Sequence, residues 1–493
     1  MRACLYATLL CSLGASACDA RFWQSFNQAN PDNCVTSQSA CPSGMACSQV
    51  SQICELIPDV TSVDPALASG AGGARVRVQG TNFGADTGLW FGQSPGAAAT
   101  QVAVMSETLL EATVPANPGD SWAVPVTVGT LGASTTRSGL FSYYAAKLSF
   151  VPEKVDAVNF AQYIDVADIN QDGNLDLVIM STSPHAAAIL LSQGNGTFLQ
   201  GASVLTPDLN SEIHALDLNN DKYPDLVILS ATGIDVFLND RQGSFPTSRH
   251  FATDAVSQSP SPGGASFADW NRDGAIDIAV SNATVDRVTL LANDGQGALG
   301  TPQEIENGTK AVSTIAGDFN GDGKPDLVSA SINSPLRFYA GNGSGGFSMI
   351  ADVAANGCEP LVGKAADLNE DGLPDLVVSC LGDKTVRVAF GKTGGGFQSA
   401  DTPLSKHPTV PSFTIADYNG DHHLDLGIFS PSEATFNVRS GDGAGGFAQV
   451  ASFTLSAGSP GRTGTAVGDF NGDGKPDFIA ALTPMFLFVN RSK

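Results

Sequence analysis

Basic residues are scarce in this sequence. Its 493 residues include 25 Lys and Arg against 49 Asp and Glu, which gives a formal net charge of −24 at pH 7. Binding to nucleic acid or to an anionic membrane surface depends on clustered Lys and Arg. The composition therefore excludes nucleic acid and a polybasic membrane patch as partners. The excess of acidic residues favours cations as ligands, provided that the acidic residues are clustered.

Long apolar runs and helical periodicity are also missing. Beyond the first twenty residues, no stretch approaches the roughly 18 uninterrupted apolar residues of a membrane-spanning helix. Apolar residues do not recur with a helical period, and 54 Gly and 27 Pro would interrupt a helix. Because apolar residues still make up 42% of the chain, it can bury a sizeable core, which is expected to be all-β.

The first seventeen residues have the features of a signal peptide. Arg2 is a charged start, a short apolar run follows, and Ala15-Ser16-Ala17 precede Cys18. Small residues followed by cysteine resemble the bacterial lipobox, which implies that Cys18 is lipidated and becomes the new N-terminus. Ala15 stands where that motif usually has Leu. Ordinary signal-peptidase cleavage after Ala17 stays open as the alternative.

The cysteine count supports lipidation. Nine cysteines are present, and removal of residues 1–17 leaves seven, an odd number in an exported chain. Lipidation of one leaves six, which can all pair. Residues 18–56 are expected to be a cysteine-rich segment with two disulfides, too small to hold a core of its own; a zinc site is the alternative. The disulfide candidates are Cys34, Cys41, Cys47 and Cys54, and separately Cys358 with Cys380.

Residues 57–145 alternate apolar and polar residues in short runs. Residues 74–78 and 123–128 have this pattern, and Gly, Pro or Asn separates such runs. The pattern is typical of a small β-sandwich. The Gly-Thr-Asn-Phe-Gly at 80–84 and the closing Phe-Ser-Tyr at 141–143 resemble an IPT/TIG domain, an immunoglobulin-like module. That resemblance implies a spacer or a partner-binding unit.

From residue 146 to residue 493 the chain repeats one pattern seven times. Each copy has Asp, Asn, Asp and Asp at positions 1, 3, 5 and 9 of a nine-residue stretch, followed by apolar residues. The copies start 49 to 52 residues apart, a spacing that indicates a repeat architecture. They begin at Asp168, Asp217, Asp269, Asp318, Asp367, Asp417 and Asp469.

Each repeat has four short strand-like runs. Four strands in about 50 residues are typical of a β-propeller blade, so the seven copies predict a seven-bladed ring. The last copy ends on its third run, at residues 486–490. Its fourth strand is expected to come from residues 148–152, because this pairing removes two exposed strand edges. An open stack of β units is the alternative.

The acidic stretch is the candidate metal site of each blade. In the fourth copy Asp318, Asn320 and Asp322 alternate along a tight turn, Gly323 permits the bend, and Asp326 completes the oxygen donors. Position 7 varies between copies, as expected if it contributes only its backbone carbonyl. Hard oxygens in a flexible shell favour Ca²⁺ over Mg²⁺ or Zn²⁺, so up to seven Ca²⁺ are expected. The candidate ligands are Asp168, Asn170, Asp172, Asn174, Asp176, Asp217, Asn219, Asp221, Tyr223, Asp225, Asp269, Asn271, Asp273, Ala275, Asp277, Asp318, Asn320, Asp322, Lys324, Asp326, Asp367, Asn369, Asp371, Leu373, Asp375, Asp417, Asn419, Asp421, His423, Asp425, Asp469, Asn471, Asp473, Lys475 and Asp477.

A single loop of this kind could be an Asx-rich turn that needs no metal. Seven copies weaken that alternative, because unpaired carboxylates at this density repel one another. Position 6 is Gly in five copies but Lys222 in the second and His422 in the sixth. A side chain at positive φ costs about 1 kcal/mol, so these two loops are expected to bind metal most weakly.

The DFNGDGKPD-type stretches, with Gly-rich turns that end in Phe, resemble the FG-GAP/VCBS repeats of integrin α-subunit propellers and many bacterial surface proteins. The resemblance covers residues 146–493 and implies a propeller whose loop Asp and Asn residues bind calcium. The family's Gly-Ala-Pro element is replaced here by residues such as Met180-Ser181-Thr182. This difference is nearer the bacterial VCBS type, so integrin-like ligand recognition is not implied.

Little else in the sequence carries chemistry. No HExxH motif and no Ser/His/Asp cluster is visible, and four Trp and seven Tyr form no stripe of sugar-binding aromatics. Gly391-Lys392-Thr393 lacks the spacing of a phosphate loop and is expected to be a turn. No catalytic residue is therefore expected, although distant residues could still assemble a site at a propeller mouth.

The sequence thus predicts an all-β chain: a seven-bladed calcium-binding β-propeller after an immunoglobulin-like β-sandwich. The expected function is a non-enzymatic, monomeric cell-surface protein that presents the propeller to a protein or glycan ligand. It would be exported to a bacterial envelope and held by a lipid on Cys18, or secreted without that lipid. The expected contact surface is the face of the ring opposite the acidic turns. It would include links between the second and third strands, such as 182–185 and 331–334, and the links between blades, of which 253–264 is the longest. A carbohydrate-active enzyme and an architectural envelope component are the alternatives.

Overall fold

The computed structural model describes residues 45–47 and 54–492 with short internal gaps. Within the described residues all regular structure is β-strand, so no helix of the length and apolarity that a membrane crossing needs occurs there. The chain divides into two compact units, which meet in sequence at Ala146 and Lys147. The expected signal peptide, Cys18, Cys34, Cys41 and nearly all of the 253–264 link lie outside the described residues. The gaps are 86, 94–95, 120, 131–133, 146, 156–160, 183–184, 207–211, 231–232, 254–263, 283–285, 308–310, 332–333, 354–357, 399–402, 455–463 and 483–484.

Two short strands of the cysteine-rich segment are described. β1 (Met45–Cys47) pairs antiparallel with β2 (Cys54–Leu56), and the register places Cys47 opposite Cys54. The two disulfides expected in this segment stay a prediction.

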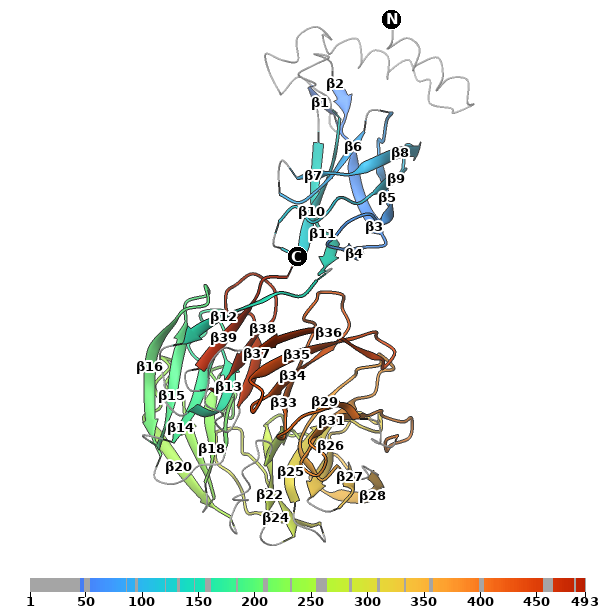
Figure 1. The fold of residues 1–493 in the computed structure, drawn as a ribbon. Helices are drawn as coiled ribbons and strands as arrows, with labels where there is room; N and C mark the ends of the chain where they lie inside the picture. Colours follow the sequence, from blue (N-terminus) through green and yellow to red (C-terminus); the bar gives the residue numbers. More distant parts are fainter. Residues whose placement is uncertain are drawn as a thin grey trace, which may run out of the picture. The chain divides into compact units, whose positions relative to one another are not determined.

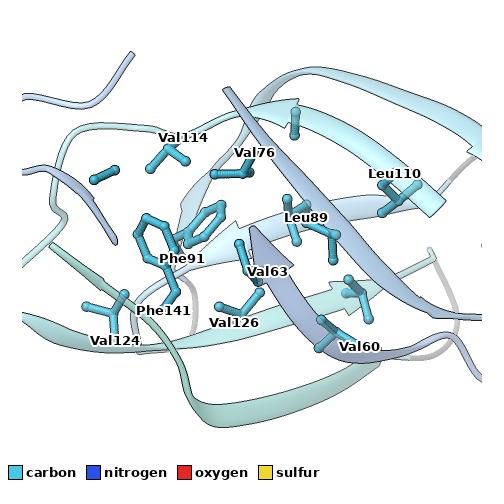
Figure 2. Packing of buried hydrophobic residues seen from close by; sticks show 14 of the residues in the cluster. Val60, Val63, Val76, Leu89, Phe91, Leu110, Val114, Val124, Val126 and Phe141 are labelled. Carbon is cyan, nitrogen blue, oxygen red and sulfur yellow. The ribbon is translucent and has the colours of Figure 1, made fainter. Parts of the chain in front are cut away.

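The first unit contains a sandwich of two sheets, in the strand orders β3-β5-β9-β8 and β4-β11-β10-β6-β7. Buried and exposed residues alternate strictly along β5, as the period-two pattern predicted. The inward residues form one core around Phe91 and Phe141, whose ring centroids are 4.7 Å apart (Figure 2). The bounds are β3 (Asp59–Asp64), β4 (Leu67–Ser69), β5 (Arg75–Thr81), β6 (Gly88–Phe91), β7 (Ala97–Ala98), β8 (Thr100–Ser106), β9 (Leu109–Thr113), β10 (Ala123–Gly129) and β11 (Ser134–Tyr144).

The second unit contains seven four-stranded antiparallel sheets, here called blades 1 to 7 (Figure 1). In chain order blade 1 is β13 (Ala161–Ala167), β14 (Asp176–Thr182), β15 (His185–Ser192) and β16 (Phe198–Leu205); blade 2 is β17 (Glu212–Leu216), β18 (Asp225–Ser230), β19 (Gly233–Leu238) and β20 (Thr247–Ala252); blade 3 is β21 (Ala265–Ala268), β22 (Asp277–Asn282), β23 (Arg287–Leu291) and β24 (Gln303–Glu306); blade 4 is β25 (Ala311–Gly317), β26 (Asp326–Ser331), β27 (Leu336–Gly341) and β28 (Phe347–Val353). Blade 5 is β29 (Pro360–Ala366), β30 (Asp375–Cys380), β31 (Thr385–Ala389) and β32 (Pro403–Lys406); blade 6 is β33 (Ser412–Ala416), β34 (Asp425–Ser430), β35 (Thr435–Gly441) and β36 (Phe447–Thr454); blade 7 is β37 (Thr465–Gly468), β38 (Asp477–Ala480) and β39 (Met485–Asn490), completed by β12 (Phe150–Val155).

The blades pack face to face around a ring. The first strands of neighbouring blades contact one another, so they are the innermost strands. The second strand is buried along its whole length in blades 2 to 6, because both of its faces meet an adjacent blade. This explains why these strands read as short apolar runs rather than alternating ones. The propeller fold expected from the repeats is confirmed.

Blade 7 closes the ring with strands from both ends of the unit. β12 pairs antiparallel with β39, from Phe150 opposite Asn490 to Val155 opposite Met485, and the two lie side by side in Figure 1. The expected pairing is confirmed, and β12 extends three residues beyond the predicted segment. β13 of blade 1 contacts β37 of blade 7, and a shared apolar core joins these two blades. The ring is therefore closed, and the alternative of an open stack of β units is wrong.

One disulfide is described, between Cys358 and Cys380, with a Cα–Cα distance of 4.6 Å. Both side chains are fully buried, and the bond joins the segment before β29 to the end of β30 in blade 5. The expected pairing of these two cysteines is confirmed.

Candidate functional site

Each acidic stretch is the loop between the first and second strands of its blade. Position 1 follows the first strand, and position 9 is the first residue of the second strand, as with Asp326 in β26. Since the first strands of all blades are equivalent in the ring, the seven loops lie at the same end of it. The repeat therefore places every candidate ligand group on one face of the propeller.

The aspartate at position 9 ties its loop to the third strand. In blade 4, Asp326 Oδ2 accepts the N–H of Phe319 at 3.0 Å, and Asp326 Oδ1 accepts the N–H of Gly341 at 2.9 Å. All seven blades have this pair of bonds, from the N–H of position 2 and from an N–H at the end of the third strand. Sequence reasoning assigned position 9 to metal alone and missed this role.

Burial raises the pKa of the position-9 carboxyl in every blade. The two backbone hydrogen bonds act in the opposite direction, and the negative charge of position 5, joined in six blades by that of position 1, raises the pKa further. The pKa reaches about 6 for Asp176, Asp225 and Asp326, and about 7 for Asp425 and Asp477. Each loop thus holds a buried carboxylate that the neighbouring acids destabilise.

The other three side chains of the loop hold backbone N–H groups. In blade 4, Asp318 accepts from positions 5 and 6, Asn320 accepts from position 5, and Asp322 accepts from position 7, at 2.8 to 3.0 Å. The same bonds occur in all seven loops. The loops are therefore Asx turns whose shape the backbone itself stabilises.

The donor chemistry of the loops suits a hard cation. A carboxylate has about four lone-pair sites, so these backbone hydrogen bonds leave acceptor capacity on the aspartates. The side chains are nevertheless not gathered into a centre: among the described residues, no group of three or more His, Cys, Asp or Glu is placed to hold a metal ion. The residues fit Ca²⁺ by type and charge, while hydrogen bonds hold the arrangement described here.

Positive φ occurs at two positions of every loop. Position 6 was predicted to need it, and Lys222 and His422 adopt φ of 75° and 71° alongside the five glycines. Position 4 was not predicted, yet it is positive throughout, including 61° at Arg272 and 57° at Glu370. Since a side chain in this region is strained, loops with two non-glycine residues carry the larger cost. Among the seven loops, loop 2 alone has two such residues, Asn220 and Lys222.

Position 2 is a further residue that the sequence reasoning missed. It is apolar and fully buried in all seven loops. Its carbonyl accepts a hydrogen bond from the next blade: Asn239 Nδ2 donates to Ile169 O at 2.9 Å, and the N–H of Gly196 donates to Phe470 O at 2.9 Å. Equivalent bonds reach Leu218, Trp270 and Tyr418. An apolar residue inside a polar loop was the available signal.

Basic side chains lie against some loops and not others. In loop 2, Arg241 Nε is 3.0 Å from Asp221 Oδ2, beside Lys222 at position 6. In loop 4, Lys324 Nζ is 3.0 Å from Asp322 Oδ2. These ion pairs place a positive charge on the carboxylate at position 5, so the seven loops differ in local charge despite their common pattern.

A second cluster lies on the innermost strands. His214 Nε2 is 3.3 Å from Glu212 Oε2, and His214 Nδ1 is 4.0 Å from Asp165 Oδ2. Burial lowers the pKa of His214, but the hydrogen bond to Glu212 and the two negative charges outweigh it, so the pKa is raised. Lys364 of blade 5 faces the same cluster, and desolvation lowers its pKa.

The two carboxylates of this cluster also join blades. Asp165 of blade 1 accepts the N–H of Ala215 in blade 2 at 2.9 Å. Glu212 of blade 2 accepts the N–H groups of Gly264 and Ala265, at the start of blade 3, at 2.8 and 3.2 Å. The cluster therefore has an evident structural role. No motif connects its members in the sequence, which is why the sequence analysis did not find it.

The melting temperature of the metal-free protein is expected to fall as the pH rises from about 4 to about 7. An unfolded aspartate titrates near pH 3.9, whereas Asp326 and Asp477 titrate at about 6 and about 7 in the fold. The folded state binds more protons in this window, so its stability is greatest at the acid end and is lost as the pH rises. Carboxyls whose pKa is lowered in the fold, such as Asp59 bonded to Arg137, change the stability only below about pH 4, so they do not affect this range. Calorimetry in chelator checks this; a constant or rising melting temperature contradicts it.

Replacing Lys222 with glycine is expected to raise the free energy of unfolding by about 1 kcal/mol, because the left-handed backbone at this position strains a side chain. The matched control is Gly323→Ala at the same loop position, where an added Cβ meets no atom within 4 Å. This control isolates the backbone effect and should lose about 1 kcal/mol. Denaturant titrations in chelator measure both. A loss of stability in Lys222→Gly would show that its side chain is held by contacts that outweigh the strain.

Among solved structures, the chain is similar to an Agrocybe aegerita lectin that recognises non-reducing terminal N-acetylglucosamine (18% identity, TM-score 0.48, covering 71% of this chain and 96% of the lectin). It is also similar to BBS1N in its complex with ARL6DN, from a crystal soaked with lead (14% identity, TM-score 0.48, covering 70% and 97%). At these scores the likenesses carry no inference about ligands. No curated protein matches the chain.

Family comparison gives a stronger result. Residues 58–143 match the IPT/TIG domain. Five overlapping segments match the FG-GAP-like repeat, at residues 168–227, 217–280, 269–329, 318–378 and 367–428. These segments cover more than half of the chain, so the protein belongs to the FG-GAP-like repeat family and carries an IPT/TIG domain ahead of its propeller.

Proposed function

We propose that this protein is a non-enzymatic binding or adhesion protein whose propeller is stabilised by calcium. The observation that supports the calcium part is the charge of the loops. Each of the seven copies has three carboxylates, of which the one at position 9 is fully buried. The negative charge at position 5, joined in six copies by that at position 1, destabilises the buried group. A divalent cation would remove this repulsion at every blade.

The ligands of each ion would be the side chains at positions 1, 3, 5 and 9 with the carbonyl of position 7. Ca²⁺ supplies no reaction step here; when bound, it neutralises charge and cross-links the loop. Seven ions would change the formal net charge from −24 to about −10. Affinities of about 10⁻⁴ to 10⁻³ M, as in other extracellular modules, would suffice in a calcium-rich medium. Loops 2 and 6 would bind most weakly.

The propeller and the IPT/TIG domain support a role in binding a partner. If the loops hold ions and fix the blades, the opposite end of the ring would be free for a protein or glycan ligand. The link at residues 253–264 is proposed as part of the contact surface. Lipid on Cys18 would hold the protein at a bacterial envelope, with the cysteine-rich segment and IPT/TIG domain as its spacer. The protein is proposed to act as a monomer.

Calcium removal is expected to lower the melting temperature of the mature protein by 10 °C or more. At 1 mM Ca²⁺ and a Kd of 10⁻⁴ M, each occupied loop contributes about 1.4 kcal/mol of stability. Calorimetry with Ca²⁺, with Mg²⁺ and with EDTA measures the shift, and native mass spectrometry counts the ions. Glycan and matrix-protein arrays, run with and without EDTA, then search for the ligand. An unchanged melting temperature together with no bound calcium would overturn the proposal.

A carbohydrate-active enzyme is the second candidate, and one observation favours it. His214 lies between two carboxylates on the innermost strands, an arrangement that can orient a general base. The test is product release from a polysaccharide panel by the wild type, His214→Gln and His250→Gln. His250 is a matched control, because its Nδ1 also lies 2.8 Å from a carboxylate, that of Asp235, but on an outer strand. We expect no product from any of the three; activity that only His214→Gln loses would favour the enzyme.

A further inference from the structure

Two of the seven loops have the same nine residues. Residues 318–326 of blade 4 and 469–477 of blade 7 both read Asp-Phe-Asn-Gly-Asp-Gly-Lys-Pro-Asp. Sequence alone therefore predicts equal behaviour toward a metal ion. The structure separates them at one side chain, the lysine at position 7.

In blade 4 this lysine is at the surface. The side chain of Lys324 is 33% exposed, and its Nζ donates to Asp322 Oδ2 at 3.0 Å, where the aspartate side chain is itself 36% exposed. Exposed ion pairs of this kind contribute little stability. A divalent cation can therefore displace the ammonium into water at small cost.

In blade 7 the same lysine is enclosed. Lys475 is 1% exposed, and its Nζ donates to the backbone carbonyl of Ser492 at 2.7 Å. Its ammonium group cannot reach water without leaving this carbonyl. A buried ammonium needs polar or charged partners, and the carbonyl of Ser492 and the negative charge of Asp473 act as such partners for Lys475.

The end of the chain holds this enclosure in place. The N–H of Ser149 donates to Ser492 Oγ at 2.9 Å, and the N–H of Ser492 donates to Asn490 Oδ1 at 3.1 Å. The N–H of Arg491 donates to Ser149 O at 2.7 Å. These bonds continue the pairing of β12 with β39, so the segment that closes the ring also covers the lysine. In blade 4 the third strand instead continues into the turn at 342–346.

The charge of Lys475 acts on the loop. Burial raises the pKa of Asp473 at position 5, and the nearby positive charge of Lys475 opposes that rise. Loop 7 therefore has an enclosed lysine at position 7 whose positive charge acts on the carboxylate of Asp473. A divalent ion would bring two further positive charges next to an ammonium group that has no route to solvent, and such like-charge contact is unfavourable.

We infer that Lys475 neutralises the seventh loop in place of a metal ion, so that loop 7 binds divalent cations at least tenfold more weakly than the identical loop 4. Ring closure at blade 7 is then independent of metal. This inference rests on the proposed calcium binding of the other loops. It lowers the proposed number of bound ions from seven to six and makes loop 7, rather than loop 2 or loop 6, the weakest site. It makes the chain end a determinant of which loops take an ion.

Matched variants of the full mature chain test the inference. Native mass spectrometry over a Ca²⁺ titration counts ions in the wild type, Asp322→Asn and Asp473→Asn. Asp322→Asn should lose one bound ion, and Asp473→Asn should lose none. Lys475→Met should gain one ion in the same concentration range, while Lys324→Met leaves the count unchanged. Loss of an ion in Asp473→Asn at the concentrations where Asp322→Asn loses one would overturn the inference.

Hydrogen exchange of the wild type supplies a measure that needs no variant. Adding Ca²⁺ to chelated protein should slow exchange of the Asp322 and Gly323 amides at least tenfold and change those of Asp473 and Gly474 by less than twofold. Equal protection of both loops would overturn the inference while leaving the calcium proposal intact. A wild type that binds no calcium and shows no protection in either loop would overturn both.

Discussion

A buried carboxylate that accepts two backbone N–H groups is the interaction on which each blade depends. It joins the loop after the first strand to the end of the third strand, so three of the four strands are fixed by one side chain. The same group is the source of the electrostatic conflict in the loop, because burial and neighbouring acids both oppose its charge. Structural support and electrostatic strain are therefore properties of a single residue in each repeat.

The ring is assembled from hydrogen bonds that pass between loops as well as from apolar faces. The residue at the end of the third strand, whose N–H donates to the position-9 aspartate, differs between blades. Asn239 and Asn490 use their side-chain amides to reach the preceding blade and the carbonyl at position 8 of their own loop. Gly341 stands at the equivalent place in blade 4, where an added Cβ would lie 2.0 Å from the carbonyl oxygen of Pro325. The blades thus share the same backbone geometry at the end of the third strand, although the residue at this position differs between them.

Much of the architecture was readable from the repeats. The period, the four runs per copy and the missing last run predicted the propeller and the pairing of β12 with β39, and glycine at position 6 predicted the positive φ there. The hydrogen-bonding role of the aspartate at position 9 could not be predicted from the sequence. An aspartate that binds a metal ion and one that accepts backbone N–H groups look the same in a sequence. Asp165 comes from a different repeat than His214 and Glu212. The burial of Lys475 depends on Ser492, which no local pattern connects to it.

Blade 7 is built from both ends of the second unit, and this has a mechanical consequence. β12 is the strand that follows the IPT/TIG domain in the chain, so any tension transmitted through that domain enters the propeller at Phe150, opposite Asn490. The bonds between Ser149, Arg491 and Ser492 lie at this point of entry and would bear the force first. If force were applied between the two units, the resistance of the ring to opening would depend on these bonds.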